Sequence, residues 1–304
     1  MPRKYKRLLL SLLTGCALAS PSLQAFNELQ PPAEYKKVSI QLVEMLEGIH
    51  YNKTQVDDRI SNLAFDAFID SLDPSKSFFL AQDIKGFEQY RYRFDDAISS
   101  GDVSLAYHIY NLYSKRVEDR LNKVLEELPE MIKGFNFEKT ETFNADPDQA
   151  VWAETEQELI DIWRKRIKNR ALTLRLNSQD ETSIETSLTR RYTNQLNQIE
   201  QTNSIDVYQI FANAITEAFD PHTSYFAPRA SETFSINMSL SLEGIGAVLQ
   251  QEDEYTQVVR LVPAGPADNQ GELHPNDKIV AVGQKGKDMI DVVGMRLDDV
   301  VDMI

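Results

Sequence analysis

Cysteine is almost absent from this chain of 304 residues, because the single one, Cys16, lies close to the N-terminus. One cysteine cannot form an internal disulfide, so the stability of the fold must come from packing alone. No apolar run is long enough to cross a bilayer as a helix. Basic residues are also scarce, since 32 Lys and Arg stand against 47 Asp and Glu and leave a net charge of −15. This balance argues against a nucleic-acid partner, which would need Lys and Arg to neutralise its phosphates.

The rest of the composition is that of a folded protein. Hydrophobic residues make up 42% and charged residues 26% of the chain, which indicates a globular rather than a disordered protein. This length suits about two domains. The four histidines, His50, His108, His222 and His274, have no metal-ligand spacing. We therefore expect neither a metal site nor another cofactor.

Residues 1–25 have the three-part pattern of a secretory signal peptide. A basic stretch ends at Arg7, an apolar stretch covers residues 8–19, and a small residue, Ala25, closes the segment. We expect export and cleavage after Ala25. A second pattern lies inside the segment, because the four residues that end at Cys16 resemble a bacterial lipobox, in which the cysteine is lipidated. Of these two alternatives, we favour the loss of Cys16 with the cleaved peptide.

Glycine is unevenly distributed and marks two regions. Residues 26–240 contain four glycines, whereas residues 241–304 contain seven. In the first region, apolar residues recur at three- and four-residue spacing, which predicts amphipathic helices between Val38 and Leu72. Further helices are expected over residues 102–128, 150–176, 181–201 and 205–219, with N-caps at Ser183 and Ser204 and stops at Pro129, Pro147 and Pro221. The predicted fold class is mainly α, with a helical N-terminal domain at 26–237 and a truncated α+β domain at 238–304.

One short pattern occurs twice. Residues 72–79 and residues 219–226 both contain an Asp-Pro pair followed by polar residues and two aromatic residues. The residue before a proline is pushed into an extended conformation, so each Asp-Pro pair should end a helix. We interpret both segments as structural corners whose aromatic residues are buried nearby.

The second region has the short apolar runs that are typical of β-strands. Strands are expected over residues 246–250, 255–262 and 278–282, and an amphipathic helix over 295–304. Gly244 and Gly246 flank Ile245 at the first strand, and such a turn can point successive N–H groups into one concavity that suits a peptide carboxylate. An extended peptide could pair with the strand while the helix supplies an apolar slot. The expected groove residues are Val248, Leu249, Leu297, Val300 and Val301.

Several motifs of the chain occur together, and in the same order, in one known family. The motifs are LTRRY at 188–192, QTNS at 201–204, DPHT at 220–223, MSLSLEGIGAVLQ at 238–250, VVRLVPAGPA at 258–267, NDKIVAVG at 276–283 and LDDVV at 297–301. Together they resemble the tail-specific proteases, which are carboxy-terminal processing peptidases. The similarity covers nearly all of residues 35–304.

The resemblance implies a helical N-terminal domain, a PDZ domain that recognises apolar C-terminal tails, and a serine protease core with a Ser/Lys dyad. The nucleophile segment, the lysine segment and the last PDZ strand of the family do not occur in these 304 residues, so we expect an incomplete PDZ domain and no catalytic residue. By position, the carboxylate-binding loop would be Gly244, Ile245, Gly246 and Ala247, and the hinge into the PDZ domain Leu240, Ser241, Leu242 and Glu243.

Apart from the missing family segments, no residues of the sequence have the pattern of a catalytic nucleophile with its general base. Neither Ser-x-x-Lys nor Gly-x-Ser-x-Gly occurs in the chain. Ser224 lies two residues from His222, but the triad geometry is not expected between such neighbours on a turn. Pairs of acidic residues are expected on solvated surfaces, and Trp152 and Trp163 in the core or at a domain contact. The chain should therefore hydrolyse nothing by itself.

The expected function is that of the substrate-recognising part of a periplasmic tail-specific serine protease, which binds the apolar C-terminal tails of proteins for proteolysis. The resemblance also implies a periplasmic lipoprotein adaptor as a partner. The alternative is a non-catalytic periplasmic adaptor or scaffold, whose long helices bind a partner. A coding sequence that continues past Ile304 into the Ser and Lys segments would favour the first hypothesis, and a stop codon there the second.

Overall fold

The computed structural model describes residues 28–144, 146, 149–177, 179–239, 244–283 and 289–304. The expected signal peptide at 1–25, the lipidation alternative at Cys16, the helix stop at Pro147 and the hinge at 240–243 lie outside these residues. Within the described ranges, no helix is both long enough and apolar enough to span a membrane.

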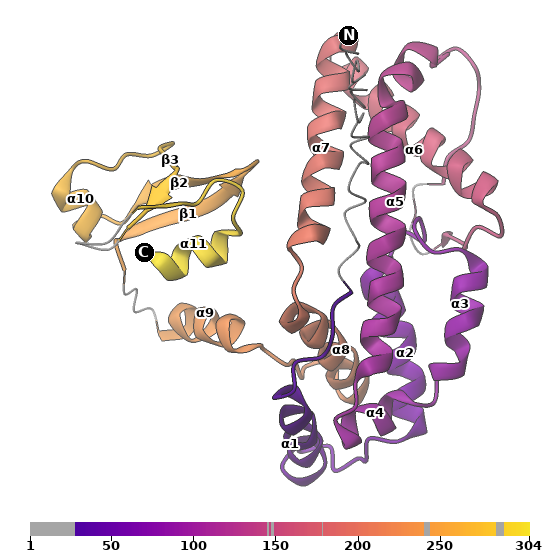
Figure 1. The fold of residues 1–304 in the computed structure, drawn as a ribbon, viewed down its shortest axis with the longest axis vertical. Coiled ribbons are helices and arrows are strands. Elements are labelled where there is room, and N and C mark those ends of the chain that lie inside the picture. Colours follow the sequence, from indigo (N-terminus) through magenta and orange to yellow (C-terminus); the bar gives the residue numbers. More distant parts are fainter. Residues whose placement is uncertain (1–27, 145, 147–148, 178, 240–243, 284–288) are drawn as a thin grey trace, which may run out of the picture.

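The first part of the chain is helical, as the spacing of apolar residues predicted (Figure 1). The pairs α2 with α8 and α5 with α7 pack against each other, which brings distant segments of the sequence together. The elements are α1 (Tyr35–Gly48), α2 (Asp58–Leu72), α3 (Ala81–Phe87), the 3-10 turn η1 (Glu88–Tyr90), α4 (Phe94–Ser100), α5 (Ser104–Gly134), α6 (Glu156–Leu176), α7 (Glu181–Gln201), α8 (Ser204–Phe219) and α9 (Pro228–Ser239).

These helices enclose two hydrophobic cores. The first core lies between α1, α2, α4, α8 and the beginning of α5, where Phe68, Phe94 and Phe211 are fully buried and pack ring against ring. The second core lies between the later part of α5, α6 and α7, and there the ring of Trp163 packs against the rings of Phe78 and Tyr192. The long helix α5 contributes to both cores and so holds them in one body.

The first Asp-Pro corner joins the two cores. The Asp73 carboxylate is 1% exposed and accepts the backbone N–H groups of Ser77, Phe78 and Phe79 at 2.9, 2.8 and 3.1 Å. Successive side chains of an extended segment point in opposite directions. Phe78 therefore enters the second core and Phe79 the first. Burial raises the pKa of the Asp73 carboxyl, although the three N–H groups and the charge of Arg166 act against this shift.

The second corner is also held by hydrogen bonds to its aspartate, but the prediction that its aromatic residues are buried was wrong for Phe226, which is 44% exposed. Helix α8 ends at Phe219, as the prediction from Pro221 required. Asp220 then accepts hydrogen bonds from the Tyr51 hydroxyl at 2.8 Å and the Thr223 hydroxyl at 2.9 Å. The Tyr51 bond, followed by the Thr223 bond, holds the pKa of the Asp220 carboxyl below its usual value.

Several predicted helix ends were wrong. Pro129 does not stop α5, which continues to Gly134 because Leu128 and Ile132, on either side of the proline, are buried in the second core. That packing compensates for the hydrogen bond that proline cannot donate. Helix α6 begins at Glu156 rather than at residue 150.

The helix caps also differ from the prediction. The N-cap of α7 is Asp180, whose side chain accepts the backbone N–H of Ser183, so Ser183 is a capped residue and not the cap. The N-cap of α8 is Asn203, which forms a capping box with Asp206 and leaves Ser204 as the first helical residue. In both helices an Asx side chain upstream of the serine does the capping. The span of α7, in contrast, agrees with the prediction.

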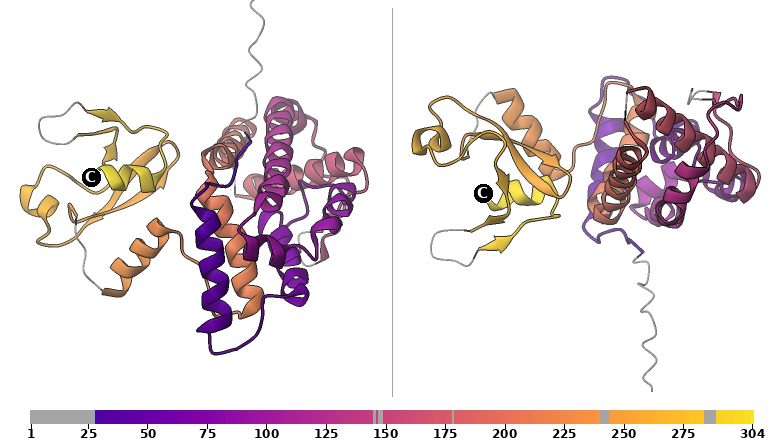
Figure 2. Two further views of the ribbon diagram at one scale, coloured as in Figure 1. Left: turned by 60° about the horizontal axis from the view of Figure 1, so that its bottom comes forward. Right: turned by 90° about the horizontal axis from the view of Figure 1, so that it is seen from above.

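The last part of the chain contains strands and short helices (Figure 2). Its first sheet is antiparallel in the order β1-β2-β3, and its second sheet pairs β4 with β5. The single strand expected over 278–282 is therefore divided between two sheets. The elements are β1 (Ala247–Glu252), β2 (Tyr255–Leu261), α10 (Pro266–Gln270), β3 (Lys278–Ile279), β4 (Ala281–Val282), β5 (Ile290–Asp291) and α11 (Leu297–Met303).

The substitution Asp73→Asn tests the first corner. The amide keeps the size of the side chain but replaces an accepting oxygen by an N–H donor, which would face backbone N–H groups. A buried donor without an acceptor costs about 1–3 kcal/mol. We expect the free energy of unfolding to fall by this amount, measured by urea denaturation with circular dichroism.

Asp70→Asn is the matched control, because this substitution removes the same charge from an exposed residue of α2. It should leave stability within about 0.5 kcal/mol of the unmodified chain. Equal losses in both variants would contradict the role assigned to Asp73.

Candidate functional site

The glycine turn before β1 has a backbone that only glycine adopts easily. Gly244 has a φ of 143° and Gly246 a φ of 76°, and both values lie in the region that disfavours side chains. A Cβ at Gly246 would also come within 3.1 Å of the Pro266 Cδ atom and 3.2 Å of the Gly265 Cα atom. Gly246 is thus required both by its conformation and by the close approach of the chain before α10.

The carbonyl groups of this turn are anchored, whereas two of its amides are not. The Ile245 carbonyl accepts the Ala267 N–H at 2.8 Å, and the Gly246 carbonyl accepts the Val262 N–H at 2.8 Å. Among the described residues, neither the Ile245 N–H nor the Gly246 N–H has an acceptor. Two such neighbouring donors are suited to binding an anionic oxygen.

Strand β1 has one free edge beside this turn. It pairs with β2 and forms the border of its sheet, while α11 packs against it. The register shifts between Val248 and Leu249, and a bulge of this kind changes the direction of the side chains that follow. An unpaired strand edge exposes a row of N–H and C=O groups to which another extended chain can add.

The five expected groove residues lie on β1 and α11, which are in contact. Val248, Leu249 and Leu297 are half-buried. Val300 is fully buried, so it contributes to the core below α11, whereas Val301 is 49% exposed. The four hinge residues expected at 240–243 lie outside the described residues.

Two arginines hold α11 from its polar side. Arg229 on α9 forms ion pairs with Asp299, at 2.8 Å, and with Asp302. Arg296, the N-cap of α11, pairs with Asp206 on α8 at 2.5 Å and also donates to the Gln201 carbonyl at 3.2 Å. These contacts set α11 against the helical part of the chain, and no pattern in the sequence predicts them.

The residues of the second corner do not form a catalytic pair. No hydrogen bond joins His222 to Ser224 within the described part of the chain. Instead, the His50 Nε2 atom lies 3.0 Å from the Thr223 hydroxyl, and the His50 Nδ1 atom accepts the Asn52 N–H.

The hydrogen bonds around Thr223 have one consistent direction. Because Nδ1 of the neutral imidazole is an acceptor, Nε2 carries the proton and donates it to Thr223. The Thr223 hydroxyl in turn donates to Asp220. His50 therefore cannot take a proton from Thr223, and the cluster stabilises the corner rather than activating a nucleophile. Among the described side chains, no group of three or more His, Cys, Asp or Glu is arranged to hold a metal ion.

Comparisons with known proteins agree with the two structural parts. The family model described as the tail-specific protease N-terminal domain matches residues 42–229, and that of the PDZ domain matches residues 233–304. The chain belongs to the tail-specific protease family. The glycine turn, β1 and α11 all lie within the PDZ match. Asp206 and Arg229 lie within the match to the tail-specific protease N-terminal domain, whereas most of α9, which carries Arg229, lies beyond the end of that match.

Relatives of the tail-specific protease family share much of this sequence. A tail-specific protease from Haemophilus influenzae is 38% identical over 84% of this chain and 36% of its own length. The carboxy-terminal processing protease CtpA from Bacillus subtilis is 31% identical over 28% of this chain and 17% of its own. The chain thus spans about a third or less of these curated relatives.

A solved structure matches the last part of the chain. It is the PDZ domain of a carboxy-terminal protease from Vibrio cholerae in complex with a peptide. Its sequence is 57% identical, with a TM-score of 0.20, over 21% of this chain and 64% of that chain.

The substitution Gly246→Ala tests the glycine turn. A side chain in the left-handed region costs about 1–2 kcal/mol. Because the new Cβ would also meet Pro266, the turn must shift. We expect faster amide hydrogen exchange across β1 and β2, measured by mass spectrometry.

Gly271→Ala is the control, since Gly271 has a similar φ of 73° but nothing within 4 Å of its Cβ position. It shares the backbone strain without the steric contact. Exchange in β1 that is no faster in Gly246→Ala than in Gly271→Ala would exclude a role for the packing of the turn against Pro266.

Proposed function

We propose that this chain is the substrate-recognising part of a tail-specific serine protease, with a helical domain at 26–237 and a PDZ domain at 238–304. It binds the apolar C-terminal tails of proteins and presents them to a protease core. The observation that carries this proposal is the free edge of β1, which begins at two amides without acceptors.

The groove supplies three interactions to a bound tail. The Ile245 and Gly246 amides bind the terminal carboxylate, the edge of β1 pairs with the backbone, and α11 with Leu297 covers the apolar last side chain. Hydrogen bonds to a charged group contribute about 1.5–3 kcal/mol each. The ordering of a flexible tail opposes this gain, so recognition is weak and broad.

Membership of the family supports the proposals for the catalytic step and the compartment. The Ser/Lys chemistry requires a nucleophile and a desolvated lysine that the motifs of these 304 residues do not include. Residues 1–25 direct the protein to the periplasm, where its partners are the tails of protein substrates and a lipoprotein adaptor.

The terminal carboxylate is the feature to test first. A peptide that ends in an apolar residue with a free carboxylate should bind the purified chain at least tenfold more tightly than its C-terminal amide, because one charge-assisted hydrogen bond exceeds the 1.4 kcal/mol of a tenfold change. Isothermal titration calorimetry measures both affinities.

An amidated peptide with one internal Asp is the control that distinguishes the effect of a terminal carboxylate from the effect of net charge. It has the net charge of the free acid but no terminal carboxylate, so it should bind as weakly as the amide. Equal affinities of the acid and the amide, or protection of residues outside β1 and α11 in hydrogen exchange with the acid bound, would contradict the groove.

Binding should occur without cleavage. We expect the tail peptide to remain intact, by mass spectrometry, after prolonged incubation with the chain, because no described residues form a nucleophile and base pair. Hydrolysis by the purified chain would contradict the assignment of catalysis to another part of the protein. Absence of tail binding, with a partner bound by α5 to α7, would favour the non-catalytic adaptor.

A further inference from the structure

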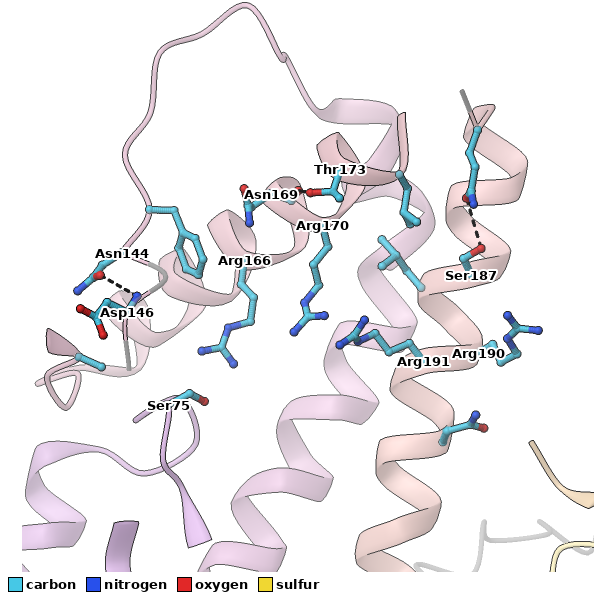
Figure 3. Close-up of a pocket in the computed structure, with 16 residues that line it drawn as sticks. Ser75, Asn144, Asp146, Arg166, Asn169, Arg170, Thr173, Ser187, Arg190 and Arg191 are labelled. Atoms are coloured by element: carbon cyan, nitrogen blue, oxygen red, sulfur yellow. Dashed lines mark hydrogen bonds between the residues drawn. The ribbon is translucent and has the colours of Figure 1, made fainter. Parts of the chain in front are cut away.

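A cavity in the helical part of the chain is lined by positive charge. It has a volume of about 770 Å³ and lies between α6, α7 and the described residues Phe143, Asn144, Asp146 and Ala150. Figure 3 shows that Arg166 and Arg170 extend into it from α6 and that Arg191 enters from α7. This volume is typical of sites that bind small molecules.

The three arginines lack the carboxylate partners that seven other described arginines have. Among the described residues, the side chains of Arg170 and Arg191 have no hydrogen bond or ion pair, and Arg166 donates to the Ser77 hydroxyl at 3.0 Å. This is unexpected in a chain with a net charge of −15. In the part of the chain that the structure describes, the arginines with carboxylate partners within 4 Å are Arg91, Arg116, Arg120, Arg164, Arg190, Arg229 and Arg296.

The cluster costs free energy in the absence of a negative group. Arg166 and Arg170 lie four residues apart on one face of α6, where like charges repel. Burial lowers the pKa of both guanidinium groups, and the neighbouring charges of Arg170 and Arg191, respectively, lower it further. A bound anion would remove this cost, because it would replace the lost hydration and offset the repulsion.

The negative groups that the structure describes near the cluster are engaged with other partners. Asp73 acts on Arg166 electrostatically, but its oxygens accept three backbone N–H groups. Asp146 lines the cavity and accepts a hydrogen bond from Gln149 at 2.7 Å. A fourth lining arginine, Arg190, pairs with Asp253 at 3.7 Å and points away from the other three (Figure 3).

A buried hydroxyl next to the cluster has no partner either. The Tyr192 side chain is 1% exposed, and its hydroxyl has no hydrogen bond to any residue that the structure describes. The charges of Arg170, Arg191 and Arg166 all act on this group. Buried polar groups are nearly always hydrogen-bonded, to protein or to ordered water, so this hydroxyl has an unused hydrogen-bonding capacity beside the three arginines.

We propose that this cavity binds a small polyanion, a molecule with two or more carboxylate or phosphate groups, through Arg166, Arg170 and Arg191. Each planar guanidinium can donate two parallel hydrogen bonds to one carboxylate or phosphate. Because the three groups come from two helices and are unpaired, they can bind separate anionic groups of one ligand. The site lies in the helical part and is distinct from the groove at β1.

Citrate and pyrophosphate are the two probes, since they carry carboxylates and phosphates respectively. Each is titrated into the full chain by isothermal titration calorimetry at constant ionic strength, so that unspecific screening is the same throughout. Saturable binding of citrate alone identifies a carboxylate ligand, and of pyrophosphate alone a phosphate ligand. Binding of both supports the shared chemistry, and binding of neither overturns the proposal.

Single substitutions place the ligand in the cavity. Arg170→Gln and Arg191→Gln should each weaken binding about tenfold or more, because each removes a charge-assisted pair. Arg59→Gln, on the exposed surface of α2, makes the same change of charge elsewhere and should leave the affinity unchanged. Equal affinities in all three variants would overturn the proposal.

Stability provides the second readout of Arg170→Gln. Without ligand, the midpoint of thermal unfolding should stay the same or rise, because the substitution relieves the repulsion with Arg166 and Arg191. A variant that binds weakly and also melts earlier than the unmodified chain would indicate a structural role for Arg170 instead, and would count against the site.

Fluorescence of Trp163 gives the position of the ligand. The Arg166 guanidinium lies 5.2 Å from the centre of the Trp163 ring, and Trp152 is the only other tryptophan of the chain. In a Trp152→Phe background, citrate or pyrophosphate should change Trp163 emission with the same midpoint as the calorimetric titration. Saturable heat with a different fluorescence midpoint, or with none, would place the ligand outside the cavity and contradict the proposal.

Discussion

The carboxylate of Asp73 is the contact on which most of the helical part depends. It gathers three consecutive N–H groups at the end of α2 and so directs Phe78 and Phe79 into different cores. Ser77, in the same turn, accepts the Trp163 indole N–H at 2.7 Å through its carbonyl and the Arg166 guanidinium through its hydroxyl. One buried acceptor thereby positions the junction of the two cores and the wall of the basic cavity.

Scarce basic residues serve two different purposes in this acidic chain. Arg229 and Arg296 are paired with carboxylates and hold α11 in place beside β1. In the cavity, by contrast, Arg166 and Arg170 are crowded together without such partners. Paired arginines fix α11 beside β1, whereas the arginines of the cavity repel one another, and the proposed anion would relieve this repulsion.

Much of the fold could be predicted from the sequence. The predictions that failed share one cause, which is that they depend on packing against distant parts of the chain. The span of α7 followed from the spacing of apolar residues, and the end of α8 from Pro221. Pro129 failed as a stop because burial of its neighbours outweighs one lost hydrogen bond. The glycine turn was visible in the sequence, since Gly246 has a local requirement for positive φ. The burial of Val300 and the ion pairs of α11 were not, because they depend on other elements.

The sequence alone thus determined the local features of the chain. These are the helical periodicity, the two Asp-Pro corners, the glycines with positive φ and the excess of acidic over basic residues. Tertiary structure decided which distant groups meet. Arg166 and Arg191 are separated by a helix end and a connector, and no spacing rule links them. Only the packing of α6, α5 and α7 around Trp163 brings their charges to one cavity, because long-range burial, unlike backbone preference, is a property of surfaces that form when the chain folds.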